Sequence, residues 1–215
     1  MIGQSERRDA EPPRTSRGLD RLIFFTDAVV AIAITLIALP LVDSAREVDA
    51  SSAAEFFSKN TVALLAAGIS FAVISAFWRE HHALFERATS YTPLLLRVNS
   101  LWLTGIVAIP VATVLLVYSH RNDRLAIGVY LGLMVYSVVL TRLIEVLLYR
   151  AGLLSDEPSG IDIAVRWVYV AITVLVLALG IAFPRIGMWW LFLLFASSPI
   201  QHLVRRRLQP GTPAE

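Results

Sequence analysis

The sequence predicts an all-α integral membrane protein with six transmembrane helices, and its composition and the arrangement of its apolar residues support this class. Hydrophobic residues make up 56% of the 215 residues and charged residues only 17%. Soluble domains contain about 45–50% apolar and about 25% charged residues. The apolar residues also form long uninterrupted runs, whereas a soluble amphipathic helix alternates apolar and polar faces.

Six segments are long and apolar enough to cross a bilayer, whose core is about 30 Å thick and needs roughly 20 helical residues. They are Leu22–Leu41, Thr61–Trp78, Leu94–Tyr118, Leu125–Tyr149, Trp167–Pro184 and Ile186–Val204. Two longer polar connections are expected, at Asp43–Asn60 and Arg79–Pro93. Pro40 is expected to end the first span, and Pro184-Arg185 joins the last two spans in a tight hairpin.

Two short polar tails are expected to flank the membrane domain. Residues 1–20 are rich in Arg, Glu and Pro and predict a disordered tail. The apolar segment that follows lacks a small-residue cleavage site, so it is expected to stay in the mature protein. The six-span domain then covers residues 21–207, and residues 208–215 form a C-terminal tail.

The distribution of basic residues orients the spans. If the N-terminus lies inside, 14 of the 19 Lys and Arg residues fall on the inner side, as cytoplasmic loops require. Both termini are therefore predicted to be cytoplasmic. The net charge of +2 is not gathered on a soluble face, so no nucleic-acid partner is expected.

The sequence contains no signature of an enzyme or of a cofactor or metal site. The usual metalloprotease, nucleophile-elbow and phosphate-loop motifs are absent. With no cysteine, disulfides and thiolate ligands are excluded. Glu80-His81-His82 contains potential metal ligands, but adjacent residues point to different faces of a helix, so no metal site is expected.

Two spacings in the fourth span predict local packing. Gly128 and Gly132 are four residues apart, a spacing typical of close helix approach, which is expected to occur within the subunit. Arg142 and Glu145 stand at i and i+3 and can form an ion pair, for which a structural role is favoured over one in transport.

The first span carries Asp27 as its only charged residue, near the predicted cytoplasmic end. A carboxylate within a span needs a partner, although a helix-end aspartate can also be favoured by the helix dipole alone. Ile32, Leu36 and Leu39 form one stripe at i, i+4 and i+7, with Thr35 beside it. Asp27 lies about 140° round the helix from Ile32. By spacing alone, such a stripe usually indicates packing or lipid contact and does not define a pore.

The start of the first span resembles the Arg-x-x-x-Phe-Ser-Asp signature of the transmembrane protein 175 family, potassium channels of bacteria and lysosomes. The matching residues are Arg21, Phe25, Thr26 and Asp27, followed by Ala31-Ile-Ala-Ile-Thr35-Leu. Threonine replaces the signature serine at position 26 and keeps its hydroxyl. Trp78 and His81 at the end of the second span and Asn99 in the third extend the resemblance. The length matches the bacterial six-span form.

The resemblance implies a homotetramer in which the first helix of each of four subunits lines a central pore. Ile32 would form the narrowest ring, a hydrophobic gate that controls conduction by wetting. Leu36 and Leu39 would form further rings, and Thr35 would provide a hydroxyl layer for cation selectivity. Because Thr-Val-Gly-Tyr-Gly is absent, a backbone-carbonyl filter is excluded.

The resemblance also implies a polar network that supports the pore helix. In the family, the aspartate end of the signature is tied to the residues that correspond to Trp78, His81 and Asn99. By themselves, Trp78 and His81 would be read as ordinary residues of the membrane interface.

The sequence therefore predicts a passive potassium-selective channel with K⁺ as the permeant ion and no cofactor. It is expected in the cell membrane, in contact with lipids, as a multi-pass protein of a bacterial inner membrane. A proton-coupled or cation carrier using Asp27 or the Arg142–Glu145 pair is one alternative, and a non-transporting scaffold is another. Carriers commonly contain internal repeats, and none is visible here.

Overall fold

The computed structural model describes residues 16–47, 52–120, 123–156 and 160–185. Seven helices and no strand are formed within these ranges. They are α1 (Ser16–Leu36), α2 (Leu39–Glu47), α3 (Ala53–Lys59), α4 (Thr61–Glu86), α5 (Pro93–Tyr118), α6 (Arg124–Arg150) and α7 (Gly160–Ala182). The first of them, α1, begins at Ser16, inside the segment predicted to be a tail. The predicted sixth span, Ile186–Val204, and the C-terminal tail lie outside the described residues.

Four described segments are long and apolar enough to cross a membrane. They are Arg17–Arg46, which covers nearly all of α1 and α2, together with α4, α5 and α6. Helix α7 adds a shorter apolar stretch, Arg166–Ala182. The prediction of an all-α membrane protein is confirmed at this level, and the count of six spans stays a prediction.

The first predicted span is broken near its C-terminal end. Helix α1 ends at Leu36, and the amides of Ile37 and Ala38 bond to carbonyls only three residues back, at 3.4 and 3.1 Å. Helix α2 then begins at Leu39, with Pro40 in its first turn. The expectation that Pro40 ends the span is wrong, because a proline in the first helical turn lacks only an N–H that would have no intrahelical partner there.

Helix α4 runs eight residues past the predicted end of the second span, from Thr61 to Glu86. The predicted connection Arg79–Pro93 is therefore helical in its first half. Hydropathy marks only the part of a helix that lies in the bilayer, whereas the residues after Trp78 are polar but compatible with a helix. The other predicted connection contains α3, whose N-cap Ser52 accepts a hydrogen bond from the amide of Glu55.

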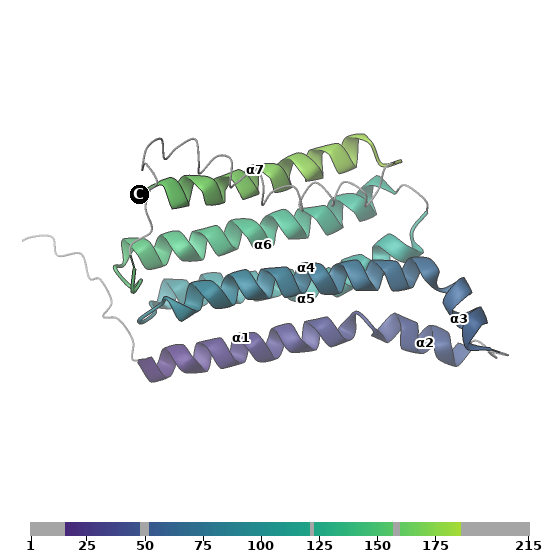
Figure 1. Cartoon of the computed structure of the whole chain (residues 1–215), viewed down its shortest axis with the longest axis horizontal. Helices are drawn as coiled ribbons and strands as arrows, with labels where there is room; N and C mark the ends of the chain where they lie inside the picture. The colour runs from purple at the N-terminus through teal and green to yellow at the C-terminus, as the bar shows by residue number, and fades with distance from the viewer. Residues whose placement is uncertain (1–15, 48–51, 121–122, 157–159, 186–215) are drawn as a thin grey trace, which may run out of the picture.

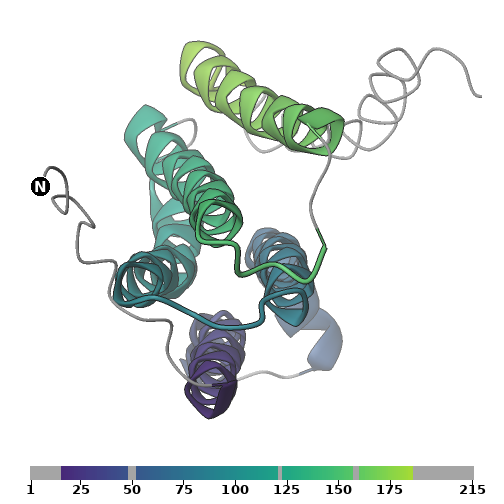
Figure 2. The same ribbon diagram turned by 90° about the vertical axis from the view of Figure 1, so that its left-hand side faces the viewer.

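The long helices run along one axis and alternate in direction (Figure 1). Viewed from the end where α1 begins, α1 lies against α4 and α5, and α6 lies on their other side (Figure 2). Helix α7 packs on α6 and is the long helix farthest from α1. The largest fully buried side chains include Trp102 of α5 and Tyr130 and Met134 of α6, so the core lies where α5 meets α6.

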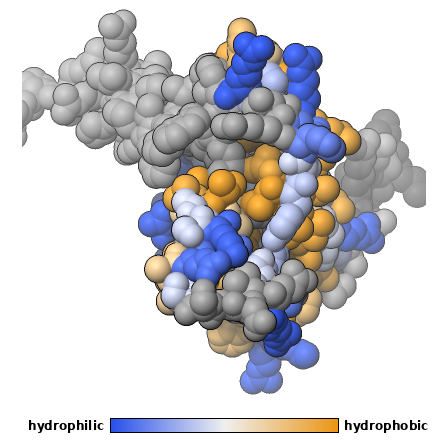
Figure 3. Space-filling model, turned by 90° about the vertical axis from the view of Figure 1, so that its right-hand side faces the viewer, coloured by the Kyte–Doolittle hydropathy of each residue, from blue (hydrophilic) through white to orange (hydrophobic). Residues whose placement is uncertain are grey.

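Apolar side chains also cover much of the described surface. Large hydrophobic residues are exposed on every long helix, as a lipid-facing surface requires. Even from the end that carries α2 and α3, hydrophobic surface remains visible between separate hydrophilic groups (Figure 3).

At the end of the bundle where α4 finishes, two connecting segments pair with each other. The amide of Thr89 donates to the carbonyl of Leu153 at 2.9 Å, and the amide of Ser155 donates to that of Arg87 at 2.8 Å. Gly152 supplies the positive φ of 65° that the second segment needs for its turn. Arg87 Nε also donates to Asp156 Oδ1 at 2.6 Å, and this hydrogen bond holds the pKa of the Asp156 carboxyl below its ordinary value.

Candidate functional site

The apolar stripe of the first span lies on the exposed side of the protomer. Ile32 is 59% exposed, Leu36 41% and Leu39 51%. Ile32 and Leu36 share one face of α1, but the turn at residues 37–38 separates them from Leu39 at the start of α2. Helical spacing therefore holds for the first two residues, and the stripe that includes Leu39 stays a prediction.

Thr35 is exposed beside this stripe. Its hydroxyl donates to the carbonyl of Ile32 at 2.8 Å. A hydroxyl hydrogen that is engaged in this way leaves the oxygen lone pairs directed away from the helix backbone. Thr35 thus presents an oxygen acceptor next to the apolar stripe.

Asp27 lies on a different side of α1 and contacts α4. The indole Nε1 of Trp78 donates to Asp27 Oδ1 at 2.9 Å, a charge-assisted bond that partners the carboxylate. The two residues also line an open groove of about 590 Å³ between α1 and α4, together with Ser75, Arg79 and five apolar or small residues. The carboxylate therefore has a partner within the protomer, as a charge inside a span requires.

A second set of contacts joins α1, α4 and α5 through Asn99. His81 Nε2 lies 2.7 Å from Asn99 Oδ1, and because an amide oxygen only accepts, the imidazole donates. The amide nitrogen of Asn99 donates to Thr26 Oγ1 at 2.9 Å. His81, Asn99 and Thr26 are all buried, so each of these polar atoms needs the partner it has.

Aromatic rings hold His81 in place. Its ring stacks between Phe85 and Trp102, with ring centroids 4.4 and 4.2 Å away. Trp102 in turn donates from Nε1 to Thr141 of α6 at 3.0 Å. Apart from its position in an apolar span, nothing in the sequence indicated that Trp102 would contact His81 and Thr141.

The structure thus brings together five of the predicted network residues and leaves two outside. The contacts described above contain Thr26, Asp27, Trp78, His81 and Asn99. Arg21 and Phe25 are exposed on α1 instead, Phe25 by 60%. The roles assigned to all seven residues stay predictions.

Two further polar groups inside the bundle had weaker sequence signals. Ser70 Oγ lies 2.7 Å from Thr113 Oγ1 and 3.1 Å from Tyr130 Oη, joining α4, α5 and α6. The predicted pair between Arg142 and Glu145 is confirmed, at 2.7 Å. Polar residues in the middle of apolar spans are the signal that could have drawn attention to the first group.

The close helix approaches fall at glycines other than the predicted pair. A Cβ on Gly128 would meet only the Ile181 side chain at 3.7 Å, and one on Gly132 would meet nothing within 4 Å. A Cβ on Gly105 would lie 2.7 Å from the Tyr136 ring, and one on Gly180 would lie 2.4 Å from Leu131. Both distances are too short for a Cβ to fit without a shift of its neighbours. Among contacts of a glycine with another helix, the tightest are therefore between α5 and α6 and between α6 and α7.

The apolar helices and the polar contacts that join them define a multi-pass α-helical membrane protein. Residues 21–110 match the family model described as endosomal/lysosomal potassium channel TMEM175. The match covers the part of the chain that contains Thr26, Asp27, Trp78, His81 and Asn99, so the chain is similar to TMEM175 potassium channels there. The match ends within α5, so α6 and α7 lie outside it. No curated protein matches the chain.

Proposed function

We propose that the protein is a potassium-selective channel that conducts K⁺ passively through a homotetrameric pore. Helix α1 of each subunit lines this pore, Ile32 forms its hydrophobic gate, and Leu36 forms a second ring. Leu39 stands past the turn, at the outer mouth. The channel acts in the cell membrane, a bacterial inner membrane, with both termini in the cytoplasm.

One observation carries this proposal: α1 exposes Ile32 and Leu36 on one side while contacts within the protomer hold Asp27 on another. Ile32 and Leu36 are 59% and 41% exposed among the residues that the structure describes. The Trp78–Asp27 bond and the Asn99–Thr26 bond fix the rotation of α1. Four such helices around an axis would present rings of apolar side chains to the pore.

The chemistry of conduction follows from this lining. A ring of isoleucines excludes water when narrow and conducts when wetted, which is the behaviour of a hydrophobic constriction. Four Thr35 oxygens, one helical turn from the gate, would replace part of the hydration shell of a cation. Their hydroxyl hydrogens are already engaged by the Ile32 carbonyls, so the oxygens can face the ion.

The test is K⁺ flux into liposomes that contain the purified protein, compared with Na⁺ flux. Ile32→Ala should increase K⁺ flux, because a smaller side chain wets more readily. Leu175→Ala is the matched control, since Leu175 is exposed to a similar degree on α7, far from α1, and it should leave flux unchanged. The absence of flux over a wide range of pH and voltage would refute the channel.

The same assay separates the alternatives. A proton-coupled or cation carrier would show K⁺ uptake that saturates at low turnover and depends on a proton gradient. A non-transporting scaffold would show neither behaviour. The tetramer is tested separately by the mass of the detergent-solubilised particle, and a stable monomer that conducts would overturn the shared pore.

A further inference from the structure

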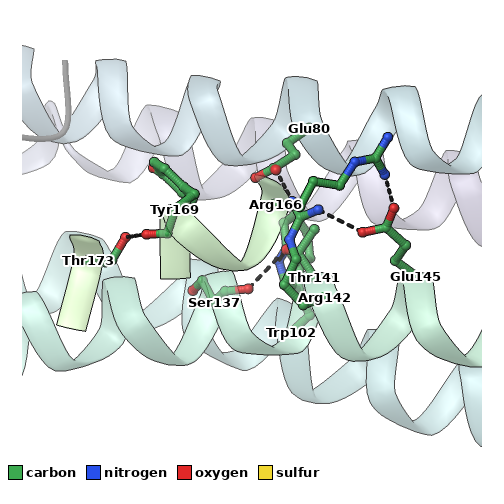
Figure 4. Close-up of polar contacts among 9 residues, drawn as sticks. All are labelled: Glu80, Trp102, Ser137, Thr141, Arg142, Glu145, Arg166, Tyr169 and Thr173. Carbon is green, nitrogen blue, oxygen red and sulfur yellow. Dashed lines mark hydrogen bonds and ion pairs between the residues drawn. The ribbon is translucent and has the colours of Figure 1, made fainter. Parts of the chain in front are cut away.

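Four charged side chains meet between α4, α6 and α7, apart from the network around Asp27. We name Glu80, Arg142, Glu145 and Arg166 the ion cluster (Figure 4). Arg142 lies at its centre: one guanidinium nitrogen pairs with Glu80 of α4 and another with Glu145 of α6. Arg166 of α7 pairs with the second oxygen of Glu145. The cluster therefore joins three helices.

Each member of the ion cluster has a partner of opposite formal charge. The cluster contains two guanidinium groups and two carboxylates, so its formal charges cancel. Arginine keeps its proton in proteins. Arg142 is 3% and Glu145 5% exposed, and buried ion pairs are generally a weak source of stability. Buried ionic groups can instead fix how the elements that carry them are arranged.

The position of Glu80 on α4 indicates that role. Trp78 and Glu80 are two residues apart, which places them about 160° apart round the helix. Trp78 contacts Asp27 of α1 on one side, while Glu80 contacts Arg142 of α6 on the other. Between them, His81 contacts Asn99 of α5. Polar contacts on opposite sides of one helix fix its rotation about its own axis.

We propose that the ion cluster is a positioning element that holds α4 in the rotation at which Trp78 meets Asp27, and so couples α6 and α7 to the pore helix α1. Glu80 and Arg142 are positioning residues, since neither lies on α1. The proposal rests on the proposed channel for its effect on conduction. Three of the four cluster residues lie outside the segment that matches the TMEM175 family.

The first test measures the channel itself, with Glu80→Gln and Arg142→Gln in the full-length protein. Each variant should change the open probability of single channels by about 2- to 30-fold, the range of residues that act on a distant site. Unitary conductance and the K⁺/Na⁺ permeability ratio should not change. Glu80→Gln should also be non-additive with Asp27→Asn, because both act through the rotation of α4.

Arg87→Gln is the matched control. It breaks another arginine–carboxylate pair near the same end of the bundle, Arg87–Asp156, which does not involve α1. The control should leave open probability unchanged. If Glu80→Gln lowers only the amount of folded protein, with the open probability of each channel unchanged, the ion cluster is structural and the positioning proposal is overturned.

A second test does not require conduction. Ser75 lines the groove between α1 and α4, and the chain contains no cysteine, so Ser75→Cys introduces one thiol on α4. Its rate of modification by a membrane-permeant maleimide should change when Glu80→Gln is added, and not when Arg87→Gln is added. An unchanged rate in both backgrounds would overturn the proposal.

The two tests separate this inference from the proposed function. If the wild-type protein fails to conduct and the thiol rate still responds to Glu80→Gln, the channel fails and the positioning role stands. If Glu80→Gln does not fold, Glu80→Asp keeps the charge but shortens the side chain, and the same two measurements apply. If the wild-type protein conducts but Glu80→Gln changes neither the open probability nor the thiol rate, only the positioning role is refuted.

Discussion

Asn99 uses both ends of its amide, and this makes it the central residue of the contacts between α1, α4 and α5. Its oxygen accepts from His81 and its nitrogen donates to Thr26. All three side chains are buried. Loss of any one would leave a buried donor or acceptor without a partner, which costs more than the hydrogen bond itself contributes. The methyl group of Thr26 is accommodated with no exposed surface, so threonine fits where the family signature has serine.

Replacing Thr26 by valine tests this contact, because valine keeps the shape and removes the acceptor for Asn99. Thr26→Val should lower the free energy of unfolding by about 1–2 kcal/mol, within the range for buried and interhelical hydrogen bonds. The measurement is the midpoint of SDS-induced unfolding in detergent. Thr104→Val is the matched control, because Thr104 is exposed and Tyr136 keeps its bond to the Leu101 carbonyl. Equal losses in both variants would contradict the assigned role of Thr26.

At the same scale, the sequence allowed some contacts to be predicted and not others. The Arg142–Glu145 pair could be read from spacing on one helix. Trp78, His81 and Asn99 could be proposed as partners of the signature only through the family resemblance. Glu80 and Arg142 are 62 residues apart, and their contact depends on how α4 and α6 pack, which one sequence does not determine.

At the scale of helices, hydropathy located the long elements but not their ends or their closest contacts. It could not reveal that α4 continues to Glu86, because the last residues leave the apolar pattern while remaining helical. It also could not reveal the turn after Leu36. The glycine spacing in α6 pointed to Gly128 and Gly132, whereas the tight approaches use single glycines on neighbouring helices.

The α5–α6 contact provides a direct test of this packing. Gly105→Ala would place a Cβ 2.7 Å from the Tyr136 ring and 2.9 Å from Ser137 Oγ, so these side chains or the helices that carry them must shift. We expect a loss of about 1–3 kcal/mol in the free energy of unfolding, as in overpacked cores. Gly132→Ala, with open space around its Cβ, should be neutral or slightly stabilising because alanine favours helix. Thermal unfolding of both variants in one detergent makes the comparison, and equal stability of the two would contradict the assigned packing.

At the scale of the whole molecule, the connecting segments around Arg87 and Asp156 tie the α4–α5 side of the bundle to the α6–α7 side. The Arg87–Asp156 pair is exposed, so its contribution is small. The direction in which this contribution changes with pH is nevertheless defined. Because the pKa of Asp156 is lowered in the folded state, the unfolded state binds the proton at higher pH, and stability falls as pH drops through the folded pKa.

Asp156→Asn should therefore be less stable than the wild-type protein at neutral pH and equal to it at acid pH. The difference should disappear as the pH falls below 3.8, the ordinary pKa of this carboxyl. Unfolding midpoints across this pH range provide the measurement. A stability difference that persists after the carboxyl is protonated would show that Asp156 acts through something other than its charge.

The long separation between Glu80 and Arg142 also has a consequence for biosynthesis. The ribosome produces Glu80 first, and at about 5–20 residues per second the 62 residues to Arg142 take roughly 3–12 s. During this interval α4 enters the bilayer with a carboxylate whose counter-charge does not yet exist. A nascent chain that stops after α5 is therefore expected to hold α4 loosely. In translocon-bound intermediates of increasing length, α4 should become protected from chemical modification only when α6 has been made.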